Sequence, residues 1–194
     1  INSYLNIFTF NKKVLNKTIK VLNKGSLVSL PTETVYGLAA NAYSKTAVAK
    51  IFKLKRRPKF NPLIMHYYNV QQILNDVVVN NNFIKLYKKL CPGPITFILK
   101  KSKNCKINSL ASAKLKTVAI RFPNHAVTRS ILKNINYPLA MPSANMSSHV
   151  SPVSAQDVYD EFKKKIKIII DGGQSVIGIE STVVDLTKNP KILR

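Results

Sequence analysis

Cysteine and acidic residues are scarce in this 194-residue sequence, and it has no long hydrophobic run. The two cysteines, Cys91 and Cys105, do not form a C-x-x-C pair and supply too few ligands for a zinc site. No apolar run approaches the roughly 18 residues that a membrane span needs. Residues 1–10 lack the basic start and long apolar stretch of a secretory signal. These absences predict a reduced cytoplasmic protein without a membrane segment.

Glycine is also sparse, with six residues, and none of them builds a known nucleotide-binding loop. The phosphate loop G-x-x-x-x-G-K-[ST] is absent, because residues 172–175 read Gly-Gly-Gln-Ser without a lysine, and no G-x-G-x-x-G follows a strand. His66, His125 and His149 lie far apart and lack metal-ligand spacing, and no nucleophile elbow is present. An enzyme with this sequence would therefore work by positioning and charge neutralisation, without a protein metal site or a covalent nucleophile.

Positive charge is what the sequence has in excess: 31 Lys and Arg stand against 8 Asp and Glu, a net charge of +23. The cations are 26 Lys and only 5 Arg, and 19 Asn accompany them, a skew that an AT-rich coding sequence would produce by drift. The lysine clusters at 100–103 and 163–165 contain no aromatic residues on which single-stranded bases could stack. We predict that most of the excess is drift on solvated faces, while attraction to RNA or anionic substrates remains a second reading.

The order of helical and strand-like segments predicts one α/β (α+β) domain over residues 1–194. Apolar residues at helical spacing, with Gly25 ending the first segment, predict helices at 14–22, 44–57, 83–90, 126–133 and 154–162. Short apolar runs predict strands at 26–30, 63–66, 95–99, 117–121, 139–141, 168–170, 181–186 and 192–193. Because strands and helices do not alternate strictly, we expect a twisted, mixed, open sheet flanked by helices.

Four polar segments adjoin these strands, where α/β proteins tend to build their sites. They are residues 30–38, 55–63, 141–145 and 178–185. Each has a structural explanation when taken alone, such as a turn with satisfied hydroxyls or cations at a helix C-terminus. Pro58 stiffens the second segment, however, and a stiff cationic loop suits phosphate recognition.

Taken together and in order, the motifs of this chain resemble those of the YrdC/TsaC family, the threonylcarbamoyl-AMP synthases. The shared motifs cover nearly the whole chain from about residue 25: Pro31–Leu38, Lys55–Leu63, Pro92–Pro94, Val118–Arg121, Pro142–Asn145, Ser151–Pro152 and Glu180–Asp185. The resemblance implies a single YrdC-like domain, which in longer family members is followed by a linker and a second domain.

The resemblance also implies a reaction and its site. L-threonine, bicarbonate or CO2, and ATP would give L-threonylcarbamoyl-AMP and pyrophosphate, and threonylcarbamoyl transferase proteins would pass the product to an adenosine in tRNA. Threonine would be held by Thr34, His66, Arg121, Met141 and Ser181. ATP would be held by Lys55, Arg57, Asn61, Thr117, Ser143, Asn145, Ser151 and Arg194, with Lys55 and Arg57 as the catalytic pair. Mg²⁺ would accompany ATP, bound largely by phosphate and water, and no tightly bound cofactor is expected.

The implied chemistry explains these residue types. A carbamate must attack the α-phosphate in line, and cations must cancel the repulsion between two anions. Lys55 offers a compact charge, whereas Arg57 offers a bidentate fork. The chain departs from the family at Arg56, where the family usually has Gly; at Cys91, where Trp is frequent; and at 147–149, where a glycine-rich stretch is usual. No departure removes a proposed ligand.

Two other functions are alternatives to the synthase, although nothing in this sequence suggests the second of them. One is a double-stranded RNA- or tRNA-binding module without synthase activity, which the basic composition would serve. The other is the YrdC-like part of hydrogenase-maturation carbamoyltransferases, which are much larger chains with acylphosphatase and zinc-finger parts. Pyrophosphate release in the presence of threonine separates the synthase from the binding module.

Overall fold

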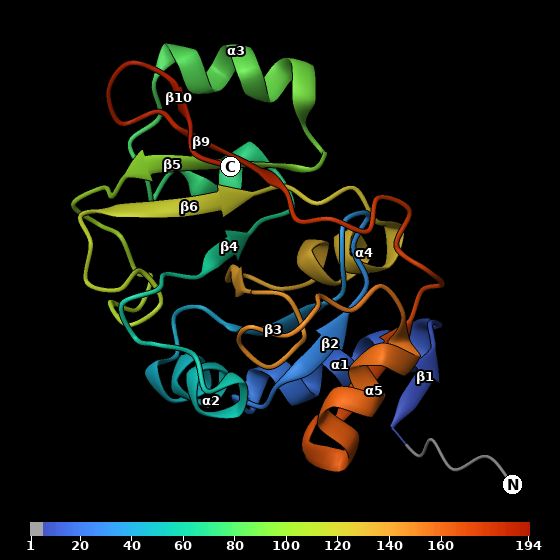
Figure 1. The fold of residues 1–194 in the computed structure, drawn as a ribbon. Helices are drawn as coiled ribbons and strands as arrows, with labels where there is room; N and C mark the ends of the chain where they lie inside the picture. Colours follow the sequence, from blue (N-terminus) through green and yellow to red (C-terminus); the bar gives the residue numbers. More distant parts are fainter. Residues whose placement is uncertain (1–5) are drawn as a thin grey trace, which may run out of the picture.

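Ten strands form one mixed sheet in the computed structural model, which describes residues 6–194 (Figure 1). In chain order the strands are β1 (Ile7–Thr9), β2 (Val28–Leu30), β3 (Gly37–Asn41), β4 (Ile64–His66), β5 (Ile95–Lys100), β6 (Thr117–Arg121), β7 (Leu139–Ala140), β8 (Ile168–Asp171), β9 (Thr182–Asp185) and β10 (Lys191–Ile192). Across the sheet they run β1-β8-β2-β3-β7-β4-β6-β5-β9-β10. Four neighbouring pairs are parallel (β1/β8, β2/β8, β4/β6 and β5/β9), and the other pairs are antiparallel, which confirms the expected mixed open sheet.

The α-helices are α1 (Lys12–Asn23), α2 (Lys45–Lys55), α3 (Asn81–Leu90), α4 (Ala126–Lys133) and α5 (Ala155–Phe162). Two short 3₁₀ helices accompany them: η1 (Val70–Ile73) lies between β4 and α3, and η2 (Lys163–Lys165) follows α5. Side-chain caps begin most of them, as the sequence predicts for α2 and α5. Ser44 accepts a hydrogen bond from the Ala47 backbone N–H, and Ser154 with Asp157 forms a capping box. These caps satisfy N–H groups that have no partner inside the helix.

Helix α2 ends at Arg56, whose φ of +50° lies in the left-handed region. A side chain in this conformation is strained, whereas glycine adopts it freely. This explains why a glycine is usual at this position in the family that the motifs resemble. The left-handed turn redirects the chain so that Arg57 and the loop after it run toward the sheet.

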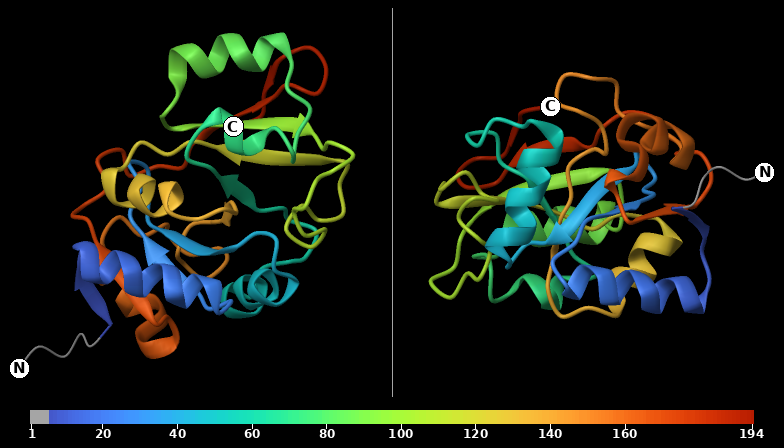
Figure 2. Two further views of the ribbon diagram at one scale, coloured as in Figure 1. Left: turned by 180° about the vertical axis from the view of Figure 1, so that it is seen from behind. Right: turned by 90° about the horizontal axis from the view of Figure 1, so that it is seen from below.

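Helices cover the two faces of the sheet unequally. Alternate strand residues point to opposite faces, and the faces bury separate hydrophobic clusters. Helices α2, α3 and α5 pack on the larger cluster, while α1 and α4 pack on the smaller one over β2, β3, β7 and β8. Figure 2 shows α1 and α4 on the side opposite α2 and α5. On the face that carries the smaller cluster, α1 and α4 therefore leave β4, β6, β5 and β9 uncovered.

Two strands are absent from the sequence-based prediction. Strand β3 reads Gly-Leu-Ala-Ala-Asn and lacks the β-branched residues that mark strands. Its small side chains are fully buried between helix layers, so tertiary packing makes it a strand. Strand β1 pairs in parallel with β8, about 160 residues away, a contact that no local pattern reveals. Residues 1–5 of the expected domain lie outside the described residues.

Candidate active site

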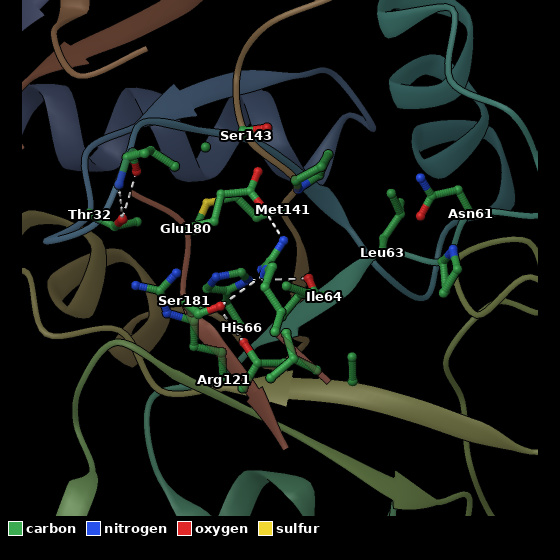
Figure 3. Close-up of a pocket in the computed structure, with 18 of the residues that line it drawn as sticks. Thr32, Asn61, Leu63, Ile64, His66, Arg121, Met141, Ser143, Glu180 and Ser181 are labelled. Atoms are coloured by element: carbon green, nitrogen blue, oxygen red, sulfur yellow. Dashed lines mark hydrogen bonds and ion pairs between the residues drawn. The ribbon is translucent and has the colours of Figure 1, made fainter. Parts of the chain in front are cut away.

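A cavity of about 280 Å³ opens on the uncovered sheet face (Figure 3). Its floor consists of alternate strand residues that share this face. They are Ile64 and His66 of β4, Ala119 and Arg121 of β6, Thr96 and Ile98 of β5, and Val183 of β9. The residues between them, such as Met65, Ile120 and Phe97, point the other way into the core. Side chains alternate between the two faces of each strand, so the same strands supply apolar residues to the core and the residues of the cavity floor.

All four polar segments of the sequence meet at the rim of this cavity. Thr32, Val35 and Gly37 come from the first segment, and Arg57, Asn61 and Pro62 from the second. Met141, Pro142 and Ser143 come from the third, and Glu180 and Ser181 from the fourth. Arg194, the last residue of the chain, also lines the cavity. Their convergence supports reading the segments as one site.

Arg121 is the central cation of the floor and is only 4% exposed. Its Nη2 donates to Glu33 Oε1 at 2.8 Å and to Thr34 Oγ1 at 2.9 Å. Its Nε is buried and has no hydrogen-bond partner among the described residues. An unpaired buried N–H costs about 1–3 kcal/mol, which a ligand oxygen would recover. Arg121 is therefore the strongest candidate for binding a carboxylate.

His66 and Ser181 lie beside Arg121 as polar but uncharged groups. Burial, with a smaller contribution from Arg121, lowers the pKa of His66 to about 3, so its imidazole is neutral at physiological pH. Its Nδ1 lies 3.2 Å from the Ile64 carbonyl oxygen. Ser181 Oγ is hydrogen-bonded to Thr96 Oγ1 at 2.8 Å. This end of the cavity therefore offers neutral hydrogen-bonding groups around one cation.

Arg57 is the cation at the other end of the cavity. Its Nη2 donates to Asn61 Oδ1 at 2.7 Å and to the Pro62 carbonyl at 2.9 Å, and its Nε donates to the Asn61 carbonyl at 3.1 Å. The guanidinium thus ties the loop into a tight turn and is itself held in place. Arg56, in contrast, is exposed and is not among the cavity-lining residues.

Lys55 lies behind the cavity wall and is 1% exposed. Its Nζ donates to the Ser143 carbonyl at 2.5 Å, to Asn145 Oδ1 at 3.3 Å and also to the Asn145 carbonyl. These three acceptors use the three N–H donors of an ammonium group. The geometry shows Lys55 holding the segment that contains Ser143 and Asn145.

Burial, assisted by the nearby Arg57, lowers the pKa of Lys55 to about 8 from 10.5. Between these values the folded protein binds fewer protons than the unfolded chain, so the contribution of Lys55 to stability must rise with pH. We expect the free energy of unfolding of the wild type, relative to that of Lys55→Met, to rise by roughly 2 kcal/mol from pH 7 to pH 9.5. Urea unfolding at several pH values measures this difference. Lys53→Met, at an exposed position of the same helix, is the matched control, and parallel curves for wild type and Lys55→Met would contradict the prediction.

Of the remaining residues predicted to bind ATP, only Arg194 lines the cavity; Asn145, Ser151 and Thr117 are not among the lining residues. Asn145 accepts from Lys55 and donates to the His149 carbonyl at 2.6 Å. Arg194 forms an ion pair with Glu180, and its Nε donates to the Ser181 carbonyl at 3.1 Å. Ser151 Oγ is 3.5 Å from Glu180 Oε1. Thr117 begins β6 on the face of Ala119 and Arg121 but is not among the cavity-lining residues.

Sequence reasoning assigned no role to several groups that the structure brings into the site. Glu33 and Glu180 are two of only eight acidic residues, and each forms an ion pair with a site arginine. Their scarcity and their position inside the motifs were the available signal. Gly37 also lies inside a motif, Pro31–Leu38, but nothing in the sequence shows that it faces Met141. Thr96 had no signal, because its contact with Ser181 is made across the fold.

The fold and the site define an α/β domain with a cationic small-molecule cavity on an open sheet face. The sequence pattern of the family Sua5_yciO_yrdC, described as "Telomere recombination", matches residues 20–194. The chain belongs to the Sua5/YciO/YrdC family.

Relatives of known name share both sequence and structure with this chain. It is 43% identical over 175 residues to the threonylcarbamoyl-AMP synthase of Pyrococcus abyssi, and the aligned region covers 89% of this chain and 50% of that protein. It is 38% identical to the Bacillus subtilis threonylcarbamoyl-AMP synthase, covering 95% of this chain and 54% of that protein. The crystal structure of P. abyssi Sua5 complexed with L-threonine superposes with a TM-score of 0.92 at 39% identity, over 97% of this chain and 56% of that one. The chain therefore spans about half the length of these relatives.

Proposed function

We propose that this domain makes L-threonylcarbamoyl-AMP and pyrophosphate from L-threonine, bicarbonate or CO2, and ATP, as a nucleotidyltransferase. One observation carries the proposal: two arginines, Arg121 on the cavity floor and Arg57 on the loop after α2, line one cavity. One cation suits an amino acid and the other suits a phosphate chain. Similarity to threonylcarbamoyl-AMP synthases and to a threonine-bound structure supports the same reaction.

In the proposed complex, threonine occupies the end of the cavity near Arg121, with Thr34, His66, Met141 and Ser181 around it. ATP occupies the end near Arg57, where Asn61, Ser143 and Arg194 lie on the wall. The threonine nitrogen adds to CO2, and the resulting carbamate oxygen attacks the α-phosphate as pyrophosphate leaves. Arg57 would offset the charge of the two anions as they approach.

Lys55, Asn145, Ser151 and Thr117 complete the proposed ATP site from positions off the wall. For Lys55, the three carbonyl contacts support a positioning role, in which it fixes Ser143 and Asn145, more than direct contact with phosphate. The proposed pair of Lys55 and Arg57 would then divide the work. Arg57 would touch the nucleotide, and Lys55 would hold the loop opposite it.

Mg²⁺ is proposed to enter with ATP. This ion commonly binds one or two carboxylates together with substrate phosphates. Glu180 is the carboxylate on the cavity wall, and residues 6–194 hold no cluster of three or more His, Cys, Asp or Glu side chains that could hold a metal ion. These groups fit an ion bound mainly by phosphate and water, whose positive charge would offset that of the reacting phosphate.

The proposed product would be handed to a threonylcarbamoyl transferase that acts on tRNA, and the cytoplasm is the proposed location of the reaction. No helix within residues 6–194 is long and apolar enough to cross a bilayer. The net charge of +23 would also favour direct contact with the phosphates of tRNA. The named relatives support the synthase and not an RNA-binding module without activity.

The proposal is tested by incubating the chain with ATP, threonine and bicarbonate, and measuring pyrophosphate and threonylcarbamoyl-AMP by mass spectrometry. We expect both products only when all three substrates are present, because the carbamate must form before the α-phosphate is attacked. Omission of threonine is the control. Equal pyrophosphate release without threonine would refute the synthase assignment.

A further inference from the structure

Glu33 is a largely buried acid that directly contacts Arg121, the arginine proposed to bind a carboxylate, yet the proposed reaction gives it no role. Its side chain is 11% exposed and lies at the base of the first polar segment. Oε1 accepts from Arg121 Nη2 at 2.8 Å, and Oε2 accepts from the backbone N–H of Asn124 at 3.1 Å. Its own carbonyl oxygen accepts from the Ile177 N–H at 3.0 Å. The carboxylate is therefore fixed on both oxygens, and its backbone is fixed as well.

Glu33 and Thr34 together use both hydrogens of Arg121 Nη2. The guanidinium is planar, so holding one of its nitrogens from two directions fixes the orientation of the whole group. The Nε–H is left buried and without a partner among the described residues. The arrangement thus holds Arg121 through Nη2 and leaves the Nε–H without a protein partner, so that a ligand oxygen can accept from it.

We propose that Glu33 is a positioning residue that orients Arg121 for recognition of the carboxylate of an α-amino acid substrate. This inference rests on the proposed function. Glu33 also offsets the positive charge of Arg121. Recognition of a carboxylate would therefore depend on the direction of the Nε–H group and on neighbouring hydroxyls as well as on net charge.

The opposite role, in which Glu33 competes with the substrate for Arg121, fits the geometry less well. A competing carboxylate should occupy the donor that the ligand needs, but Glu33 contacts Nη2 and leaves Nε free. Without Glu33, a guanidinium that is 4% exposed would be a buried charge lacking its ionic partner. It would turn toward other acceptors, and its alignment would be lost.

The test compares two ligands that differ only at the carboxylate, L-threonine and L-threoninamide. Their affinities are measured by calorimetry, directly or in competition, for wild type, Glu33→Gln and Glu33→Ala. Gln keeps the shape of Glu but cannot accept hydrogen bonds from both Arg121 and Asn124. We expect each variant to lose about ten- to a hundredfold of the preference for threonine over threoninamide, the effect of losing a charge-assisted contact. Asp160→Asn, which neutralises an exposed carboxylate outside the cavity, should keep the wild-type preference.

Each other outcome has one meaning. Equal loss of affinity for both ligands would show that Glu33 only supports the loop, and tighter threonine binding in Glu33→Gln would show competition; either would overturn the inference while leaving the proposed function intact. If wild type binds no threonine, the proposed function fails and the inference fails with it. Circular dichroism of the variants establishes that each is folded before binding is compared.

Discussion

Arg57→Lys is expected to lower the turnover efficiency of pyrophosphate release by about ten- to two-hundredfold, the equivalent of losing one charge-assisted contact of about 1.5–3 kcal/mol. Arg57 donates to two carbonyl oxygens and one amide oxygen of its own loop, which holds its fork in place. A lysine ammonium keeps the charge but has no planar fork, so it cannot both brace the loop and present a second edge to phosphate. The fold should survive, because Arg57 belongs to neither hydrophobic cluster and its hydrogen bonds brace only its own loop.

Arg56→Lys is the matched control for this substitution. Arg56 is the adjacent arginine, it is exposed, and it is not among the cavity-lining residues, so its replacement should leave turnover unchanged. Pyrophosphate release and thermal melting are measured on both variants. Wild-type activity in Arg57→Lys together with loss in Arg56→Lys would mean that the wrong arginine has been assigned to the nucleotide.

Gly37→Ala is expected to reduce both stability and threonine-dependent turnover, because the close approach of Met141 to Gly37 leaves no room for a methyl group. A Cβ at this position would lie 2.4 Å from Met141 Cγ and 2.8 Å from its Sδ. Overpacking of this kind costs about 1–3 kcal/mol. In a protein of this size that cost lowers the melting temperature by roughly 2–12 °C. Both residues line the cavity, so a displaced Met141 would also change its shape.

A second substitution separates this steric effect from a general effect of alanine in β3. Met141→Ala removes the atoms that the new Cβ would meet, so the double variant should melt at a higher temperature than the sum of the two single effects predicts. Differential scanning calorimetry of the four proteins completes this cycle. Simple additivity of the two losses would show that Gly37 is needed for some reason other than its contact with Met141.

Local patterns in the sequence were sufficient to locate most helices and strands. The helical spacing of apolar residues and the caps at Ser44 and Ser154 identified α2 and α5, because both signals act within a few residues. The period of two in β6 set Val118 and Ile120 toward the core and Arg121 toward the other face. The motifs likewise identified the candidate ligands, since a Lys-x-Arg pair or a run of hydroxyls can be read without knowing what lies opposite it.

Tertiary structure alone decided which of these groups act together. Glu33 and Arg121 are 88 residues apart, as are Lys55 and Ser143, and the pairing order of the strands brings each pair within hydrogen-bonding distance. Likewise, β3 is a strand because its neighbours β2 and β7 satisfy its backbone hydrogen bonds, although its composition favours no strand. Secondary structure depends on interactions between residues near in sequence, whereas the site depends on contacts between distant strands and loops. The sequence by itself therefore determined the residue types available for binding anions, and the fold determined which donor of each residue remains free to do so.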